Sequence, residues 1–90
     1  MRQLQFTRSY RNDIKRMVRR GLDFSRLDSV VNSLAAAAIL DAKFRDHPLQ
    51  GVWKGWRECH ISPDWLLIYK ADKVHVILGR TGTHSDLFNK

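Results

Sequence analysis

Three short apolar runs separated by tight turns constrain the fold of this 90-residue chain more than any other feature. WRECHI at 56–61 alternates weakly, WLLIYK at 65–70 is almost continuously apolar, and KVHVILGR follows at 73–80. Ser-Pro-Asp separates the first two runs, with Pro63 fixing φ for a turn, and Ala-Asp separates the last two. Strands joined by such short turns pair antiparallel. The second half of the chain is therefore predicted to be a three-stranded antiparallel meander.

The first half of the chain predicts one strand and two helices. LQF at 4–6 is a strand candidate, and apolar residues at helical spacing run from Tyr10 until Gly21 ends the helix. A second helix is expected to begin near Ser25. The predicted order is β-α-α-β-β-β, an α+β fold in which a helical hairpin packs on one face of a small antiparallel sheet. Residues 1–90 form a single domain in this interpretation.

The balance of charge favours a polyanionic partner. The net charge is +7 and the sequence pI is about 10.2, so RNA, DNA, an anionic membrane or an acidic protein are candidates, with nucleic acid first. The first predicted helix carries six cations, Arg8, Arg11, Lys15, Arg16, Arg19 and Arg20. Either this is a solvated face, or Arg16, Arg19 and Arg20 contact an RNA partner.

Cysteine content and apolar runs favour a cytoplasmic chain without a membrane anchor. Cys59 is the only cysteine, so no intramolecular disulfide can form, and the first ten residues have no apolar run typical of a secretory signal. The longest apolar run, residues 34–40, is much shorter than the roughly 18 residues that cross a bilayer.

Three of the four histidines stand at the ends of predicted elements. His47 lies in a loop, His60 near the end of a strand and His84 after the RTGT stretch, whereas His75 lies inside a strand and is expected to be structural. Imidazole titrates near neutral pH and can exchange protons. A carboxylate at Asp64 could orient one of them, and Arg80 with the following TGT loop could hold a phosphate.

Metal binding and a cysteine nucleophile are less consistent with the spacing of these residues along the sequence. His60 and Asp64 have the spacing of a helical metal pair, but Pro63 opposes a helix and no C-x-x-C or H-x-x-x-H pair occurs. We therefore predict neither a metal site nor a cofactor. Cys59 and His60 are neighbours on a strand and face opposite ways, so Cys59 is expected in the core. For Trp65, core packing and base stacking both stay open.

Residues 46–70, DHPLQG.WKG.R..H..PDW.LIYK, and 80–88, RTGTHSDLF, resemble the YafQ branch of the RelE/ParE superfamily, toxins of bacterial type II toxin–antitoxin systems. The first half matches only in length, charge and helices. The resemblance implies a RelE-like, microbial RNase-like fold and a ribosome-dependent endoribonuclease that cuts mRNA in the A site of the 70S ribosome. It also implies a cognate antitoxin that covers the site, and operator DNA bound only through the toxin–antitoxin complex.

Carried over position by position, the resemblance implies these site residues: His47, His60, Asp64, Arg80 and His84 as catalytic groups, with Trp65 and Phe88 against the bases. We assign the general base to His60 supported by Asp64, with His47 as a second candidate. Arg80 would neutralise the phosphate and His84 would act as general acid. Which histidine is base and which is acid stays open. The expected products are a 2′,3′-cyclic phosphate and a 5′-OH, formed without a metal.

Two other functions fit the same composition. One is a basic nucleic-acid-binding module without chemistry, and the other is a gyrase poison of the ParE type on the same scaffold. ParE-type toxins look dissimilar at the histidines of this chain, which favours the ribonuclease interpretation.

Overall fold

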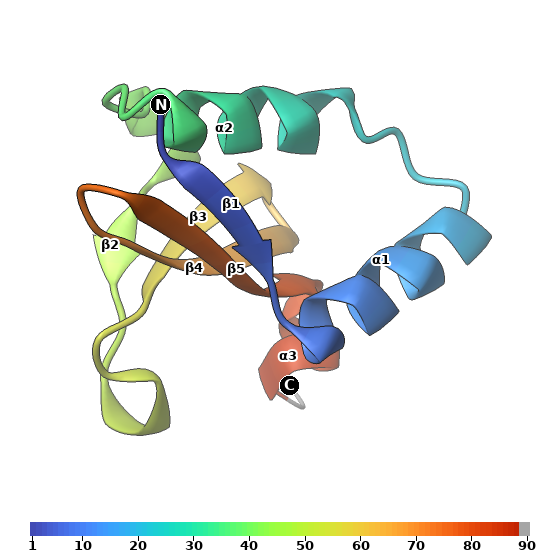
Figure 1. Cartoon of the computed structure of the whole chain (residues 1–90). Coiled ribbons are helices and arrows are strands. Elements are labelled where there is room, and N and C mark those ends of the chain that lie inside the picture. Colours follow the sequence, from blue (N-terminus) through green and yellow to red (C-terminus); the bar gives the residue numbers. More distant parts are fainter. Residues whose placement is uncertain (89–90) are drawn as a thin grey trace.

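A five-stranded sheet in the order β1-β5-β4-β3-β2 forms the centre of the protein (Figure 1). The computed structural model describes residues 1–88. Its elements are β1 (Gln3–Phe6), α1 (Arg8–Arg19), α2 (Ser25–Ala35), the 3₁₀ turn η1 (Ala42–Phe44), β2 (His47–Pro48), the 3₁₀ turn η2 (Gly51–Trp53), β3 (Arg57–Ser62), β4 (Trp65–Ala71), β5 (His75–Gly82) and α3 (His84–Phe88).

The α+β class and the order of the main elements are confirmed, and the sheet adds two features. The three strands separated by short turns are β3, β4 and β5, and they pair antiparallel as expected. β1 pairs in parallel with β5, so the sheet is mixed rather than wholly antiparallel. The "HP" of the predicted loop forms β2, a two-residue strand that pairs with β3. His47 is therefore held by a strand and not by a free loop.

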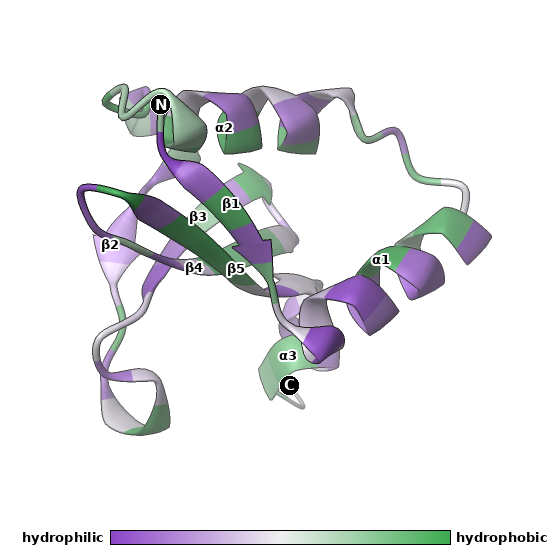
Figure 2. Cartoon of the chain, viewed as in Figure 1, coloured by the Kyte–Doolittle hydropathy of each residue, from purple (hydrophilic) through white to green (hydrophobic). Residues whose placement is uncertain are grey.

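Helices α1 and α2 pack on one face of the sheet, over a core to which both contribute. Figure 2 shows the apolar residues of α2 on its side facing the sheet. The core includes Tyr10, Met17, Leu27, Val30 and Leu34 from the helices, and Cys59, Ile61, Leu67, Val76 and Leu78 from the strands. Cys59 is thus a core residue, as the alternation of β3 predicts.

The two helices do not form the closely packed hairpin that the short link suggested. Figure 1 shows them diverging from the link, α2 along one end of the sheet and α1 beside the end of β5. An apolar groove lies between them, lined by Phe6, Tyr10, Ile14, Val18, Phe24 and Leu27. Val18 of α1 and Phe6 are therefore partly exposed in this groove and do not pack against α2.

The junction between β1 and α1 fixes the start of α1 against β5. The Thr7 hydroxyl accepts a hydrogen bond from the Tyr10 backbone N–H, which caps the helix. The same hydroxyl donates to the Gly79 carbonyl at 2.7 Å. Within residues 1–88, no helix has the length and apolar character needed to cross a membrane.

Candidate active site

The register of the sheet places a row of polar side chains on the face that the helices leave open. His47 lies opposite Glu58, His60 opposite Leu66, and Arg80 opposite Ile68. Residues opposite each other on paired strands share a face, and so do residues two apart on one strand. Four polar side chains, His47, Glu58, His60 and Arg80, therefore project from the same face. Residues that are far apart in the sequence thus share one surface.

Three histidine rings form a continuous row with His60 in the middle. The ring centroids of His47 and His60 are 5.9 Å apart, and those of His60 and His84 are 6.2 Å apart. His75, which we expected to be structural, lies elsewhere on β5, 3.8 Å from Asp72. The predicted grouping of three histidines is thus present in the structure.

Glu58 is a buried carboxylate between two of these histidines. Its Oε1 lies 3.4 Å from His60 Nε2 and 4.0 Å from His47 Nε2. Burial lowers the pKa of His60, and the positive charge of Arg45 lowers it further, while Glu58 acts in the opposite direction. His60 is consequently neutral at physiological pH, the form that a general base requires.

Asp64 pairs with His84 and not with His60, which corrects the pairing expected from the sequence. Its Oδ1 lies 2.6 Å from His84 Nδ1 and accepts the His84 backbone N–H at 3.0 Å. These two interactions hold the pKa of Asp64 below its usual value. The reason is topological: β4 pairs antiparallel with β5, Leu66 opposite Gly82, so the turn before β4 lies beside the end of β5, where α3 begins.

Arg80 is held by the buried carboxylate of Asp13 on α1. The guanidinium donates to both carboxylate oxygens, at 2.7 Å from Nε and 3.0 Å from one terminal nitrogen. Asp13 is 2% exposed, and it also accepts bonds from Arg16 and from the Thr81 backbone. Bonds to Asp13 raise the pKa of Arg80. The Arg80 side chain is nevertheless 25% exposed.

Helix α3 is a docked element, and His84 is its first residue and not part of a loop. Thr83 and Asp86 form a reciprocal cap: the Asp86 N–H donates to the Thr83 hydroxyl and the Thr83 N–H donates to the Asp86 carboxylate. Arg20 of α1 donates to both oxygens of Asp86, at 2.7 and 3.0 Å. This bidentate pair lowers the pKa of Asp86. The position of His84 therefore depends on α1.

Two of the three arginines that we expected to bind RNA thus have a structural role. Arg16 lies 2.8 Å from Asp13 and 3.8 Å from Asp86, and Arg20 pairs with Asp86. Only Arg19 of this group makes no ion pair with the part of the chain that the structure describes. Reversing the charge of Arg16 and Arg20 would consequently disturb α3 as well as any docking surface.

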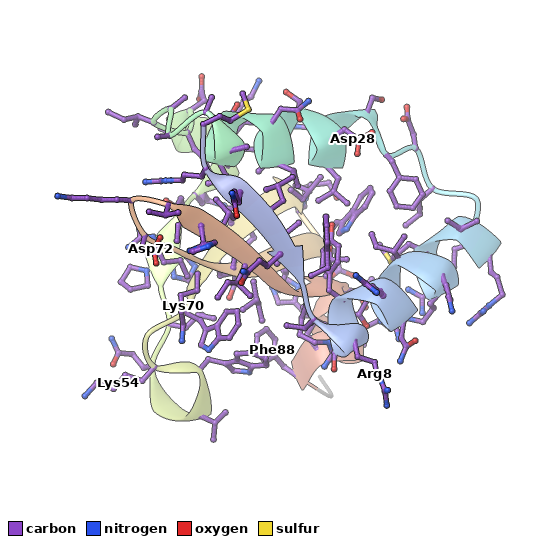
Figure 3. All side chains as sticks on the ribbon, in the orientation of Figure 1. Arg8, Asp28, Lys54, Lys70, Asp72 and Phe88 are labelled. Atoms are coloured by element: carbon purple, nitrogen blue, oxygen red, sulfur yellow. The ribbon has the colours of Figure 1, made fainter. Side chains whose placement is uncertain are left out.

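The two expected base-stacking residues differ in position. Trp65 is 8% exposed, packs edge-on against Phe24, and donates from its indole nitrogen to the Thr81 hydroxyl at 2.9 Å. This burial resolves the choice in favour of core packing, and the indole supports the strand that carries Arg80. Phe88 is half-buried at the end of α3 (Figure 3) and stays a candidate for contact with a base.

The same face could hold a metal ion, which the spacing of residues did not suggest. His47, Glu58 and His60 can each offer one ligand atom within 4.8 Å of the others. Two imidazoles and a carboxylate suit zinc or a similar transition metal. No sequence spacing could indicate this group, because the pairing of β2 with β3 brings His47 to the other two.

Three acidic residues of the site were missed in the sequence: Glu58, Asp13 and Asp86. Glu58 stands two residues before His60 in a predicted strand, so strict alternation would have placed both on one face. The T-x-x-D spacing from Thr83 to Asp86 could have indicated a helix cap. Asp13, the single acid among the cations of α1, had no local feature that indicated Arg80 as its partner.

Comparisons with known proteins place this chain among bacterial toxins. A family model described as a bacterial toxin of type II toxin-antitoxin system, YafQ, matches residues 2–89. The mRNA interferase toxin YafQ of Escherichia coli (strain K12) is 40% identical over 88 residues, covering 97% of this chain and 96% of that protein. A crystal structure of the E. coli DinJ-YafQ toxin-antitoxin complex matches with a TM-score of 0.89 at 40% identity, covering 97% of each chain. A metal-bound toxin from Helicobacter pylori matches with a TM-score of 0.90 at 40% identity, covering 98% of this chain and all of the other. The chain therefore belongs to the YafQ family of type II toxins.

Proposed function

We propose that this chain is an mRNA interferase, the toxin of a type II module, which cuts mRNA in the A site of the ribosome. The observation that carries the proposal is the pair of carboxylate–histidine contacts, Glu58 with His60 and Asp64 with His84, beside the guanidinium of Arg80. Cleavage of RNA needs a proton acceptor, a proton donor and a cation around one phosphate. The family and the relative named as an mRNA interferase support the same activity.

The reaction is an in-line attack of a ribose 2′-oxygen on its own 3′-phosphate. His60 accepts the proton of the 2′-OH at Nε2 as the new P–O bond forms, and the Glu58 carboxylate, 3.4 Å from that nitrogen, stabilises the imidazolium that results. Arg80 neutralises the charge on the phosphate oxygens. His84 gives a proton to the 5′-oxygen as the old P–O bond breaks, while Asp64 holds the proton on Nδ1 and leaves Nε2 to make the transfer. The products are a 2′,3′-cyclic phosphate and a 5′-OH end.

A metal ion held by His47, Glu58 and His60 would compete with this chemistry. A coordinated imidazole nitrogen has no free electron pair with which to accept a proton, so the ion would block the base. The metal-bound relative from H. pylori has an overall structure like that of this chain. We therefore propose a reaction without metal, in which zinc or copper ions inhibit cleavage.

The proposed partner is an antitoxin with an acidic, amphipathic segment. The apolar groove between α1 and α2 exposes Val18 and Phe6, and the cations Arg11 and Lys15 border it. Such a groove fits a segment that folds on binding and carries its own acids. A relative has been solved as a toxin–antitoxin complex, which supports this partner. Operator DNA would be bound only by the complex of the two proteins.

The decisive test is a cleavage assay with purified toxin, translating ribosomes and a defined mRNA. We expect cuts in the A-site codon, cyclic phosphate ends and 5′-OH ends, and no cleavage of the same mRNA without ribosomes. Cleavage should persist with a zinc chelator at constant free magnesium, and added zinc should reduce it. Intact mRNA on translating ribosomes would overturn the activity, and loss of cutting that zinc restores would overturn the metal-free mechanism.

A further inference from the structure

A second group of cations surrounds a pocket of about 350 Å³ beside His60. Three cations line the pocket: Arg26 at the start of α2, and Lys43 and Arg45 in and just after η1. His60 forms part of its wall. None of the residues that line this pocket is acidic. The pocket thus joins three positive charges from two separate segments to a proposed catalytic residue.

The three cations differ from Arg16 and Arg20 because none of them has an acidic partner in the described part of the chain. In residues 1–88, neither Arg26 nor Lys43 nor Arg45 makes an ion pair with a carboxylate, although the Lys43 ammonium lies 5.3 Å from the ring centroid of Phe44. Three unpaired cations around one concave site repel one another and are stabilised when an anion enters. Their arrangement therefore points to a bound anion.

Arg45 and His60 each show a further sign of a site that is incomplete without a ligand. Arg45 has a φ of 47°, in the left-handed region, which a residue with a side chain adopts at a cost and which is common at functional sites. The Nδ1 atom of His60 is buried and has no hydrogen-bond partner within the described chain. A buried polar atom without a partner is unusual in a folded protein.

We propose that this pocket binds the phosphate of the substrate RNA that lies next to the scissile phosphate. The inference rests on the proposed function, in which the scissile phosphate lies between His60, Arg80 and His84. His60 stands between that position and the pocket, so a strand that enters the reaction centre continues into the cations on the other side. The pocket would then fix the register of the strand, and with it the distance from the 2′-OH to His60.

Short RNAs that cannot be cut test this placement on the free toxin. The probes are 2′-O-methyl trinucleotides in which neither, one or the other phosphodiester is replaced by an uncharged methylphosphonate. With the wild-type chain, each replacement should weaken binding about tenfold, the effect of one charge-assisted contact. In the Lys43→Gln/Arg45→Gln variant, replacing the phosphodiester that occupies the pocket should not weaken binding any further. Replacing the other phosphodiester should still weaken binding about tenfold. The salt dependence of binding should also fall by about 0.7 in log–log slope.

A matched variant separates a specific contact from loss of net charge. Lys54→Gln/Lys73→Gln removes the same charge from two exposed positions outside the pocket, so it should stay sensitive to both replacements. All four side chains are exposed, and circular dichroism should show an unchanged fold. A Lys43→Gln/Arg45→Gln variant that responds to both replacements as the wild type does would overturn the proposal.

The pocket could instead bind a phosphate of ribosomal RNA. Binding to ribosomes that carry no mRNA distinguishes this possibility from binding of the substrate. The pocket variant should bind ribosomes without mRNA within about twofold of wild type. Weaker ribosome binding with unchanged trinucleotide binding would assign the pocket to ribosomal RNA and overturn the substrate subsite. Failure of the proposed function is distinct: a wild-type chain that never cuts mRNA overturns the activity, whereas the trinucleotides decide the pocket by themselves.

Discussion

The two carboxylate–histidine pairs of the site are built in different ways. Glu58 and His60 are two residues apart on β3, and both are largely buried. Asp64 and His84 come from a turn and from the first residue of α3, and their side chains are 67% and 43% exposed. One pair is set by the alternation of a single strand. The other depends on long-range assembly, because α3 is docked on α1 through Asp86 and Arg20.

This difference suits the two pairs to different steps of RNA cleavage. Burial and the nearby Arg45 keep His60 neutral, as a proton acceptor must be. The His84 side chain is exposed, and Asp64 binds its Nδ1 atom. The Nε2 atom can therefore reach the leaving 5′-oxygen while the proton on Nδ1 stays in place. We therefore propose His60 as the base and His84 as the acid, and the predictions below test parts of that proposal.

The largest expected effect is on the exposed pair. His84→Ala should reduce mRNA cleavage at least about a hundredfold, the range for loss of a general acid. Ribosome and antitoxin binding should stay close to wild type, and the fold should survive because His84 supports little of the core. The measurement is single-turnover cleavage on programmed ribosomes.

The control for this variant is His75→Ala, which removes a histidine from β5 away from the row. It should cleave at nearly the wild-type rate. Wild-type cleavage by His84→Ala, or loss of activity because the protein unfolds, would remove His84 as the general acid.

A smaller effect is expected at the carboxylate that holds His84. Asp64→Asn keeps the size of the side chain but replaces the charged acceptor, so cleavage should fall about tenfold. The loss should lie in the cleavage step, with ribosome affinity unchanged. If Asp64 instead supported His60, as the sequence suggested, the acid limb of the pH profile would shift together with the rate. An unshifted acid limb is the result that the structure predicts.

Much of the fold could be predicted from the sequence because its information is local. Tight turns around Pro63 and at Asp72 fixed the antiparallel meander, and alternation placed Cys59 and His60 on opposite faces. The parallel pairing of β1 with β5 is non-local and leaves no mark on residues 3–6. Likewise, β2 has only two residues, too few for any periodicity.

The grouping of the histidines could be predicted from the sequence, but the partners of these residues could not. The rings of His47, His60 and His84 form one row, as expected. Asp64 pairs with His84 and not with His60, because the antiparallel pairing of β4 with β5 brings the start of β4 to the end of β5. From the sequence we also treated the arginines of α1 as a single group on one exposed face. Only the tertiary structure shows that Arg16 and Arg20 are paired with buried or docked acids, whereas Arg45 has no acidic partner within residues 1–88.

Arg45 offers a test of the buried pair through the pH dependence of cleavage. Its charge helps to lower the pKa of His60, so His60 stays neutral at pH values below its ordinary pKa of about 6.5. Arg45→Gln should raise the pKa of His60 and move the acid limb of cleavage to higher pH. Lys73→Gln, with the same loss of charge, should leave the limb in place. An acid limb that does not move would show that His60 is not the group that titrates.

The smallest effect is on stability, and it tests how the exposed pair is assembled. The pKa of Asp86 is lowered in the folded chain by its bonds to Arg20, from an ordinary value of about 3.9. A carboxylate with a lowered pKa stabilises the fold above the unfolded pKa, and this contribution is lost as pH falls through the folded pKa. Asp86→Asn should therefore lower the free energy of unfolding by about 0.5–1 kcal/mol at pH 7. In urea melts, the gap between variant and wild type should close as pH falls below about 4. A gap that is the same at pH 3 and pH 7 would show that the ion pair with Arg20 does not hold α3, and that His84 is positioned by Asp64 alone.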